Sequence, residues 1–492
     1  MRGFTGEMFH WWPAFLFLFT AIFQVVGFYC AVKAVLISRT PQAAIGWALA
    51  LIVFPYLAIP LFLVFGESRF SGYVAATQKS DYLEVGENRS EKLDAELGRA
   101  QDALRGFEAH LPGKYADCEK IALRLRGLPA TTGNRVRLLV NGEETFPAIF
   151  EAIRKAENYV IVQFFIVRDD VVGRQLHRLL LEARLRGVRC WLLFDGVGSA
   201  KKITKAYIEE LRTAGVSVQS FVTNRQFGRH FQINFRNHRK LVVVDGKIGF
   251  LGGLNVGDDY RGLGFLGPWR DTHVQIEGPA VIAVQVSFLE DWNYVAGDVP
   301  ELPAEPRVYG QQIVMPFASG PTENWNITPA VFCQIIHDAQ KRLWIASPYF
   351  VPDYALKSAL AHAALRGVDV RIILPQNADH LLPWLSSFTN YPFMRTAGVR
   401  IWRYQPGFMH QKMLLADDDI AIVGSVNLDY RSFMLNFELS TVVYDRSFAI
   451  QVEKMLEADF ALSLPEDLGK YENGSLWFRL KCRLAGLMSP EQ

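Results

Sequence analysis

Two short motifs of the same form, H-x-K-x-x-x-x-D, hold the residues of this chain that are best suited to chemistry. Together they supply the predicted catalytic set, which is His238, Lys240, Asp245, His410, Lys412 and Asp417. In an extended strand alternate side chains share one face, so the histidine and lysine of each motif project together, about 7 Å apart. An imidazole can attack phosphorus while an ammonium group neutralises a phosphate oxygen. The motifs therefore predict chemistry at a phosphodiester, and the aspartates, at the turns that close the strands, are expected to fix the local geometry.

A run of small residues and an amide follows each motif. The two runs contain Gly252, Gly253 and Asn255, and Gly424, Ser425 and Asn427. Small residues allow a backbone amide or a hydroxyl to approach a phosphate closely, and an asparagine amide donates to its oxygens. The sequence predicts that Asn255, Asn427 and Ser425 bind phosphate.

A carboxylate follows each run, Asp271 in the first case and Glu438 in the second. A carboxylate bonded to Nδ1 of a histidine fixes its tautomer and stabilises the imidazolium. Which histidine each carboxylate serves is left open. Because the histidines and lysines supply the positive charge that a metal would otherwise bring, the sequence predicts neither a metal ion nor a cofactor.

The remaining eight histidines, among them His110, His177 and His380, have no such surroundings in the sequence. A lone histidine is more often a packed core residue than a functional one. We expect these eight to be structural.

The elements that must position the motifs alternate between apolar β-type runs and helical runs from about residue 131 onward. The runs 138–140, 159–167, 190–194 and 241–244 are predicted strands, and 150–156 and 174–186 are predicted helices. Continuous apolar strands that alternate with helices predict an α/β fold with a mostly parallel sheet covered on both faces.

This order of elements occurs twice. Residues 185–188 match 365–368, and residues 212–216 match 395–399. The first segment of each match precedes the motif at His238, and the second precedes the motif at His410. The first copy holds an additional stretch at 225–237, which we expect at the mouth of the site or at a lipid surface. The predicted organisation is a transmembrane hairpin (1–66), a helical connector (67–130), two catalytic domains (131–310 and 311–470) and a basic amphipathic tail (471–492).

Two long apolar runs precede this body. Residues 8–32 and 40–66 contain no Asp, Glu, Lys or Arg, and each exceeds the roughly 20 residues that cross a hydrocarbon core. They predict two membrane spans. The net charge is only +2, which argues against a nucleic-acid partner. The five cysteines are scattered and odd in number, so neither a disulfide framework nor a zinc site is predicted.

The motifs and their surroundings resemble the phospholipase D superfamily and, within it, the bacterial cardiolipin synthases. The residues that carry the resemblance are 234–240, 252–255, 269–272, 291–292 and 424–438, together with the two apolar runs and the tail from Trp477 to Met488. The resemblance implies two phospholipase D-like α/β/α domains behind a membrane hairpin. It also implies a multi-pass protein of the bacterial inner membrane, with a cytoplasmic catalytic part favoured.

The resemblance further implies a reaction in which two phosphatidylglycerol molecules give cardiolipin and glycerol through a phosphatidyl-histidine. By this resemblance His238 is the nucleophile and His410 the acid and base. The expected partners are phosphatidylglycerol and the lipid bilayer, and the oligomeric state is open. Three alternatives stay open: a phospholipase D-type hydrolase or transphosphatidylase acting on other phospholipids, a membrane-tethered nuclease, and a non-catalytic lipid-binding protein.

Overall fold

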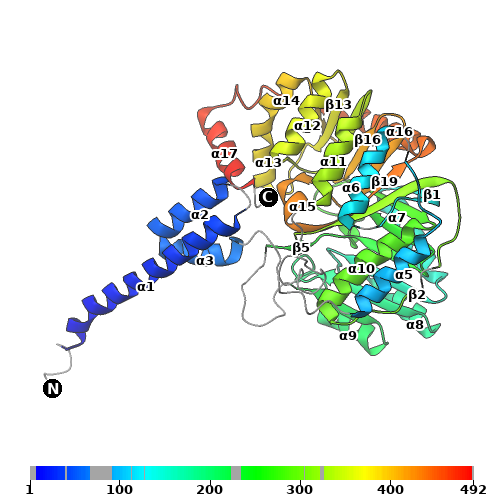
Figure 1. Ribbon diagram of the computed structural model, residues 1–492, viewed down its shortest axis with the longest axis horizontal. Helices are drawn as coiled ribbons and strands as arrows, with labels where there is room; N and C mark the ends of the chain where they lie inside the picture. Colours follow the sequence, from blue (N-terminus) through cyan, green and yellow to red (C-terminus); the bar gives the residue numbers. More distant parts are fainter. Residues whose placement is uncertain are drawn as a thin grey trace. The chain divides into compact units, whose positions relative to one another are not determined.

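The computed structural model of the chain describes residues 7–38, 41–66, 91–111, 113–126, 128–222, 234–303, 305–321 and 326–489 (Figure 1). The chain forms two compact units. An N-terminal unit comprises residues 1–72 and 223–235, and a catalytic unit comprises 73–222 and 236–492. Most of the additional stretch that the sequence singled out, residues 225–233, lies outside the described residues.

The N-terminal unit contains three apolar helices, α1 (Glu7–Ile37), α2 (Pro41–Val53) and α3 (Pro55–Phe65). Within the described part of the chain, one helix, from Ala14 to Ile37, is long and apolar enough to cross a membrane. The second apolar run, which we expected to form the second span, is two helices of 13 and 11 residues. It breaks at Phe54, because a residue that precedes proline is disfavoured in the helical conformation.

Close approach of α1 and α2 depends on small residues. A Cβ atom at Gly27 would lie 2.5 Å from the carbonyl oxygen of Leu51, so only glycine fits there. Ala31 and Ala34 are buried on the same helix. The Gln24 amide donates to the Ile52 carbonyl oxygen over 2.8 Å.

The catalytic unit is built on one 16-stranded sheet in which two halves have the same strand order. The strands of the first half are β1 (Thr131–Val140), β2 (Tyr159–Phe164), β3 (Arg189–Asp195), β4 (Ser217–Phe221), β6 (Leu241–Val244), β7 (Ile248–Gly252) and β9 (Thr272–Glu277). Those of the second half are β10 (Gln312–Ser319), β11 (Arg342–Ala346), β13 (Asp369–Pro375), β14 (Arg400–Tyr404), β16 (Met413–Ala416), β17 (Ile420–Gly424) and β19 (Asn436–Tyr444).

Each half runs inward from its edge to the centre of the sheet. The first reads β4-β3-β2-β6-β7-β9-β1 and the second β14-β13-β11-β16-β17-β19-β10, and β1 pairs with β10 where they meet. The short strands outside this series are β5 (Arg236–Asn237), β8 (Trp269–Arg270), β12 (Phe350–Val351), β15 (Phe408–Met409), β18 (Leu428–Asp429) and β20 (Ser463–Pro465).

The expectation of a mostly parallel sheet is wrong. Among the long strands of this sheet, parallel pairs occur in β2-β3-β4 and β11-β13-β14, and the short strand β5 also pairs in parallel with β19. The pairs between the two groups of long strands are antiparallel. The reason is visible at Asp245 and Gly246, whose positive φ angles of 55° and 65° form the tight turn of a β6-β7 hairpin. The strands themselves occur where the sequence predicted them.

Helices cover both faces of the sheet. On the first half α7 (Asn141–Arg154) and α8 (Val171–Leu185) lie on one face and α10 (Ala280–Ala296) on the other; on the second half α11 (Ile327–Asp338) and α12 (Tyr354–Leu365) lie opposite α16 (Arg446–Ala461). The remaining helices are α5 (Glu91–Leu104), α6 (Ala116–Arg126), α9 (Lys205–Thr213), α13 (Leu381–Ser387), α14 (Tyr391–Ala397), α15 (Tyr430–Met434) and α17 (Leu476–Leu487). The α/β class and the predicted helices at 150–156 and 174–186 are confirmed.

Candidate active site

Two short strands carry the first residues of the motifs across to the opposite half. β5, which precedes His238, pairs with the start of β19, and β15, which precedes His410, pairs with β8. The His238 amide donates to the Phe437 carbonyl oxygen over 2.9 Å, and the His410 amide donates to the Arg270 carbonyl oxygen over 2.8 Å. Each histidine is therefore held by a main-chain carbonyl group of the other half. That carbonyl group belongs to the residue just before Glu438 or Asp271.

The histidines and carboxylates pair crosswise. Nδ1 of His238 lies 2.9 and 3.0 Å from the two Glu438 oxygens, and Nδ1 of His410 lies 2.7 Å from Oδ2 of Asp271. A carboxylate at Nδ1 holds the proton there, which leaves Nε2 of each ring for the substrate. The structure thus resolves the pairing that the sequence left open.

Each carboxylate is itself held in place. The Ser425 hydroxyl donates to Glu438, and the Asn436 amide donates to it over 3.1 Å. Asp271 accepts a bond of 2.8 Å from the Thr272 amide. Ser425, predicted to bind phosphate, is fully buried and directed at Glu438, because a hydroxyl this close to a buried carboxylate is bound by the charge. This contact suits a residue that positions Glu438, and phosphate binding by Ser425 stays a prediction.

The two lysines lie beside their histidines. The Lys240 ammonium donates to the His238 carbonyl oxygen over 2.6 Å, and that of Lys412 donates to the His410 carbonyl oxygen. Both are almost fully buried. Burial lowers the pKa of Lys240 to about 7 and the pKa of Lys412 to about 8. The lysines are thus cations whose charge depends on the anions around them.

Burial and neighbouring charges together set the protonation of the two histidines and the two carboxylates. Burial lowers the pKa of both histidines, that of His410 to about 4, although the carboxylates oppose the shift. Burial alone would raise the pKa of Glu438, but His238 and Lys240 hold that pKa below its ordinary value. Burial alone would also raise the pKa of Asp271, but Lys412, His410 and the Thr272 amide together hold that pKa below its ordinary value. The free enzyme therefore holds two neutral imidazoles against two charged carboxylates.

Asp245 and Asp417 lie away from this chemistry. Asp245 accepts from the amides of residues 157, 158 and 159 over 2.8 to 2.9 Å. Asp417 accepts from the amides of 340, 341 and 342 over 2.7 to 3.3 Å. Since the whole of β6 or β16 separates each aspartate from its histidine, these residues fix the turns, as their position predicted. A catalytic role for Asp245 and Asp417 stays a prediction.

The two predicted phosphate-binding asparagines differ. The Asn255 oxygen accepts from the Ile166 amide over 3.0 Å, and its amide group lies 3.3 Å from the Tyr260 hydroxyl. Asn427 is equally buried, but its Oδ1 has no hydrogen-bond partner among the described residues and it lines a cavity. Asn427 therefore borders the cavity, whereas Asn255 is held by Ile166 and Tyr260.

This cavity has a volume of about 540 Å³ and reaches His238. Residues that contribute to its wall are Phe165, Arg236, Tyr349, His380, Asn427 and Arg431. His380, expected to be a core residue, has a side chain that is 71% exposed, so that expectation is wrong. Arg431 and Asn436 lie within the run that carries the resemblance, but no role was predicted for either because the residue types alone do not show what they face.

Two buried ion pairs brace the crossing strands. Arg239, next to His238, binds Asp291 over 2.9 Å and also donates to the Glu438 carbonyl oxygen over 3.2 Å. Arg270, next to Asp271, binds Asp459 through two bonds of 2.7 and 2.8 Å. Charge-assisted bonds of this kind fix geometry, so each pair anchors the strand that carries one half of a histidine–carboxylate couple.

A comparison with known protein families finds matches in both halves of the catalytic unit. A family described as "Cardiolipin synthase, PLD-like domain" matches residues 149–265 and 332–460. The protein named "Cardiolipin synthase A" from Pseudomonas fluorescens Pf-5 is 44% identical over 96% of this chain and 97% of its own length. The protein of the same name from Pseudomonas aeruginosa LESB58 is 45% identical over 95% of this chain and 94% of its own.

A solved structure shares the fold. The crystal structure of phosphatidylserine synthase from Haemophilus influenzae Rd KW20 superposes with a TM-score of 0.60 at 17% identity, covering 76% of this chain and all of that one. At this identity the likeness concerns the fold alone. These findings agree with the resemblance that the two motifs predicted.

Proposed function

Because the chain belongs to the cardiolipin synthase family with phospholipase D-like domains, we propose that it transfers a phosphatidyl group from one phosphatidylglycerol to another. The products are cardiolipin and glycerol. The observation that carries the proposal is the crossed pairing of two histidines with two carboxylates beside two buried lysines. This arrangement offers one imidazole as a nucleophile and one as an acid and base, and it offers cations for the phosphate oxygens.

In the first step Nε2 of His238 attacks the phosphorus of one phosphatidylglycerol. The bond between phosphorus and the oxygen of the glycerol headgroup breaks, and Nε2–H of His410 gives its proton to that oxygen. Glycerol leaves, and the phosphatidyl group stays on His238. Glu438 at Nδ1 of His238 stabilises the positive charge that the ring acquires.

In the second step neutral His410 removes the proton from the terminal hydroxyl of a second phosphatidylglycerol. The hydroxyl oxygen bonds to phosphorus, and the bond between phosphorus and His238 breaks. Cardiolipin leaves and both histidines return to their starting protonation. Lys240 and Lys412, with the Asn427 amide and that of Asn255, hold the phosphate oxygens through both steps.

Charge balance explains how one histidine acquires the first proton. In the free enzyme two carboxylates oppose two ammonium groups, and burial keeps both imidazoles neutral. A bound phosphodiester adds one negative charge, which favours protonation of a neighbouring imidazole. Substrate binding itself therefore supplies the acid that the first step needs.

The choice of His238 as nucleophile is supported by the cavity. Its wall includes His238 together with Asn427 and the side chain of Arg431. A donor phosphodiester that enters this cavity meets His238 first. The crossed geometry is otherwise nearly symmetric, so this opening is the feature that distinguishes the two rings.

The N-terminal unit fits a membrane anchor. We take residues 1–66 as a multi-pass hairpin in a bacterial inner membrane, in which α1 crosses the bilayer and α2 with α3 forms the return segment. We also take the repeated strand order as the product of duplication, with the catalytic halves at 131–310 and 311–470 and on the cytoplasmic side. An anchored site holds the intermediate near lipid hydroxyls and away from bulk water, which favours transfer over hydrolysis.

The test is lipid analysis by mass spectrometry after expression in cells that lack cardiolipin. The proposal predicts cardiolipin together with free glycerol, and no product from a His238→Ala variant at equal abundance. Phosphatidate as the main product would instead identify a phospholipase D-type hydrolase.

A further inference from the structure

Helix α17 presents an apolar stripe to its surroundings, although it belongs to the catalytic unit. The stripe, called here the α17 stripe, consists of Leu476, Trp477, Leu480, Leu484 and Leu487, which are between 43% and 81% exposed. Every other helix of this unit exposes at most two large apolar side chains, within the part of the chain that the structure describes. Contiguous exposed apolar surface of this kind marks an interaction site.

The helix is firmly seated on the unit by its opposite face. Cys482 and Ala485 are buried, and the ring of Phe478 lies edge-on to that of Phe388 with 5.4 Å between centroids. The Ser489 and Ser386 hydroxyls are 3.0 Å apart. The α17 stripe is therefore the outer side of a packed amphipathic helix.

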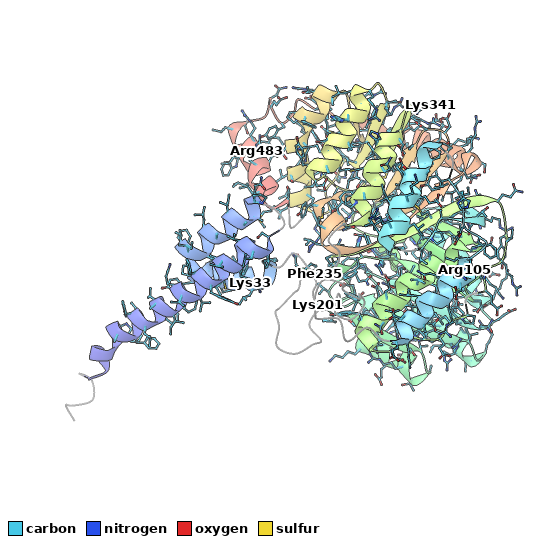
Figure 2. All side chains as sticks on the ribbon, in the orientation of Figure 1. Lys33, Arg105, Lys201, Phe235, Lys341 and Arg483 are labelled. Atoms are coloured by element: carbon cyan, nitrogen blue, oxygen red, sulfur yellow. The ribbon has the colours of Figure 1, made fainter. Side chains whose placement is uncertain are left out.

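Basic residues flank the α17 stripe on both sides. At 3.6 residues per turn the stripe covers an arc of about 100°, with Lys481 beyond one margin and Arg479 and Arg483 beyond the other. Arg483 is labelled on this helix in Figure 2. No acidic residue occurs between Leu476 and Met488. An apolar stripe with tryptophan, bordered by cations, matches the boundary of a bilayer that contains anionic lipid.

The surface continues to the mouth of the active-site cavity. α17 packs against α13, as Figure 1 shows. The first residues of α13, Leu381 and Leu382, are 64% and 49% exposed and line the same cavity as His238. The helix that packs against α17 therefore carries exposed leucines to the cavity that holds His238.

We infer that the α17 stripe and the start of α13 form a membrane contact of the catalytic unit itself, separate from the N-terminal helices, which seats the cavity mouth on an anionic lipid surface. The inference rests on the proposed function, because the lipid that must reach His238 is anionic phosphatidylglycerol. Seated in this way, the cavity admits the headgroup while the acyl chains stay in the bilayer. Arg479, Lys481 and Arg483 attract the anionic surface that carries the substrate.

The test uses the full-length protein in proteoliposomes and the double variant Leu480→Glu with Leu484→Glu. Two carboxylates on the stripe oppose insertion and repel anionic lipid. We expect the initial rate with long-chain phosphatidylglycerol in vesicles to fall at least tenfold. With short-chain phosphatidylglycerol dispersed as monomers the rate should change less than twofold, since these side chains do not contact the site.

The matched control is Leu123→Glu with Leu185→Glu, which places the same charges on exposed leucines of α6 and at the end of α8. It should match the wild type on both substrates. Equal loss of the stripe variant on both substrates, or no loss on vesicles, would overturn the inference. If the wild type makes cardiolipin from neither substrate, the proposed function fails, and the following label still reports on the surface.

A bimane label at Leu484→Cys, read against unsubstituted protein, should be quenched by lipids brominated near the top of their acyl chains. Quenching below that of a label at Leu185→Cys would overturn the inference. That outcome is expected if a second copy of the chain, or the protein's own α1 to α3, covers the stripe. Cross-linking from the label position would then identify the occupant.

Discussion

The two halves of the catalytic unit share one strand order, yet they place their histidines in different surroundings. The ring of His238 lies 5.1 Å from that of Phe165 and borders the open cavity. The ring of His410 lies 4.9 Å from Trp269 and 5.7 Å from Phe408. His238 thus borders the cavity and His410 packs against two aromatic rings, although the two side chains are almost equally buried, at 11% and 10% exposed.

Their carboxylates differ as well. Glu438 is held by two side chains, Ser425 and Asn436, whereas Asp271 is held by the Thr272 amide and the Trp269 indole. A repeated frame therefore supplies two imidazoles at equivalent positions, and the residues packed around each decide what it does. Because each carboxylate comes from the opposite half, neither half holds a complete histidine–carboxylate couple.

The largest expected effect is loss of either histidine. His238→Ala and His410→Ala should each lower cardiolipin synthesis by roughly 10³-fold or more, because one removes the nucleophile and the other the proton carrier. Initial rates with phosphatidylglycerol vesicles measure this. The double variant should be no slower than the slower single variant, since groups that act as a unit are not additive. A single variant that keeps most activity contradicts a two-histidine mechanism.

Substitution of the two carboxylates should distinguish the roles of the two histidines further. Glu438→Gln and Asp271→Asn should each slow synthesis by roughly 10²-fold or more, because the wrong tautomer becomes available at Nδ1. With a phosphatidyl p-nitrophenyl ester, whose leaving group needs no acid, Glu438→Gln should lose the burst of p-nitrophenol and Asp271→Asn should keep it. The reverse pattern would make His410 the nucleophile and His238 the acid and base, because Asp271 supports His410 and Glu438 supports His238.

Residue types and local spacing predicted the motif strands, the two carboxylates and the turn role of Asp245 and Asp417, because each depends on neighbours in the chain. The crossed pairing could not be predicted, since it depends on β5 pairing with β19 some 200 residues away. The contact between Ser425 and Glu438 could not be predicted either, because a hydroxyl suits a carboxylate as well as a phosphate. The antiparallel centre of the sheet did have a signal, the Asp-Gly pair at 245–246, which favours a hairpin.

A moderate effect is expected from pH. The pKa of Lys240 is about 7 and that of Lys412 about 8 in the free enzyme, so both lysines are cations below these values and lose their protons as pH rises through them. The kcat/KM for anionic phosphatidylglycerol should therefore fall roughly tenfold between about pH 7 and pH 9. In Lys240→Arg the group stays charged, and the fall should begin later. A profile that is flat to pH 10 contradicts this.

The smallest effect on catalysis is expected at the turns. Asp245→Asn and Asp417→Asn weaken the acceptor of three main-chain amides, so each should lower the free energy of unfolding by about 1–3 kcal/mol. Denaturant unfolding in detergent measures this. The kcat of the folded fraction should change less than twofold in either variant. A large loss of kcat without loss of stability would return these aspartates to the chemistry.

The central claim, that the two equivalent histidines have unequal roles, is tested most directly by trapping the intermediate. Full-length His410→Ala is mixed with the phosphatidyl p-nitrophenyl ester, quenched within one turnover, digested and analysed by mass spectrometry. We expect a phosphatidyl group on the peptide that carries His238, and no adduct in His238→Ala. An adduct on His410 in His238→Ala, with none on His238, would contradict it.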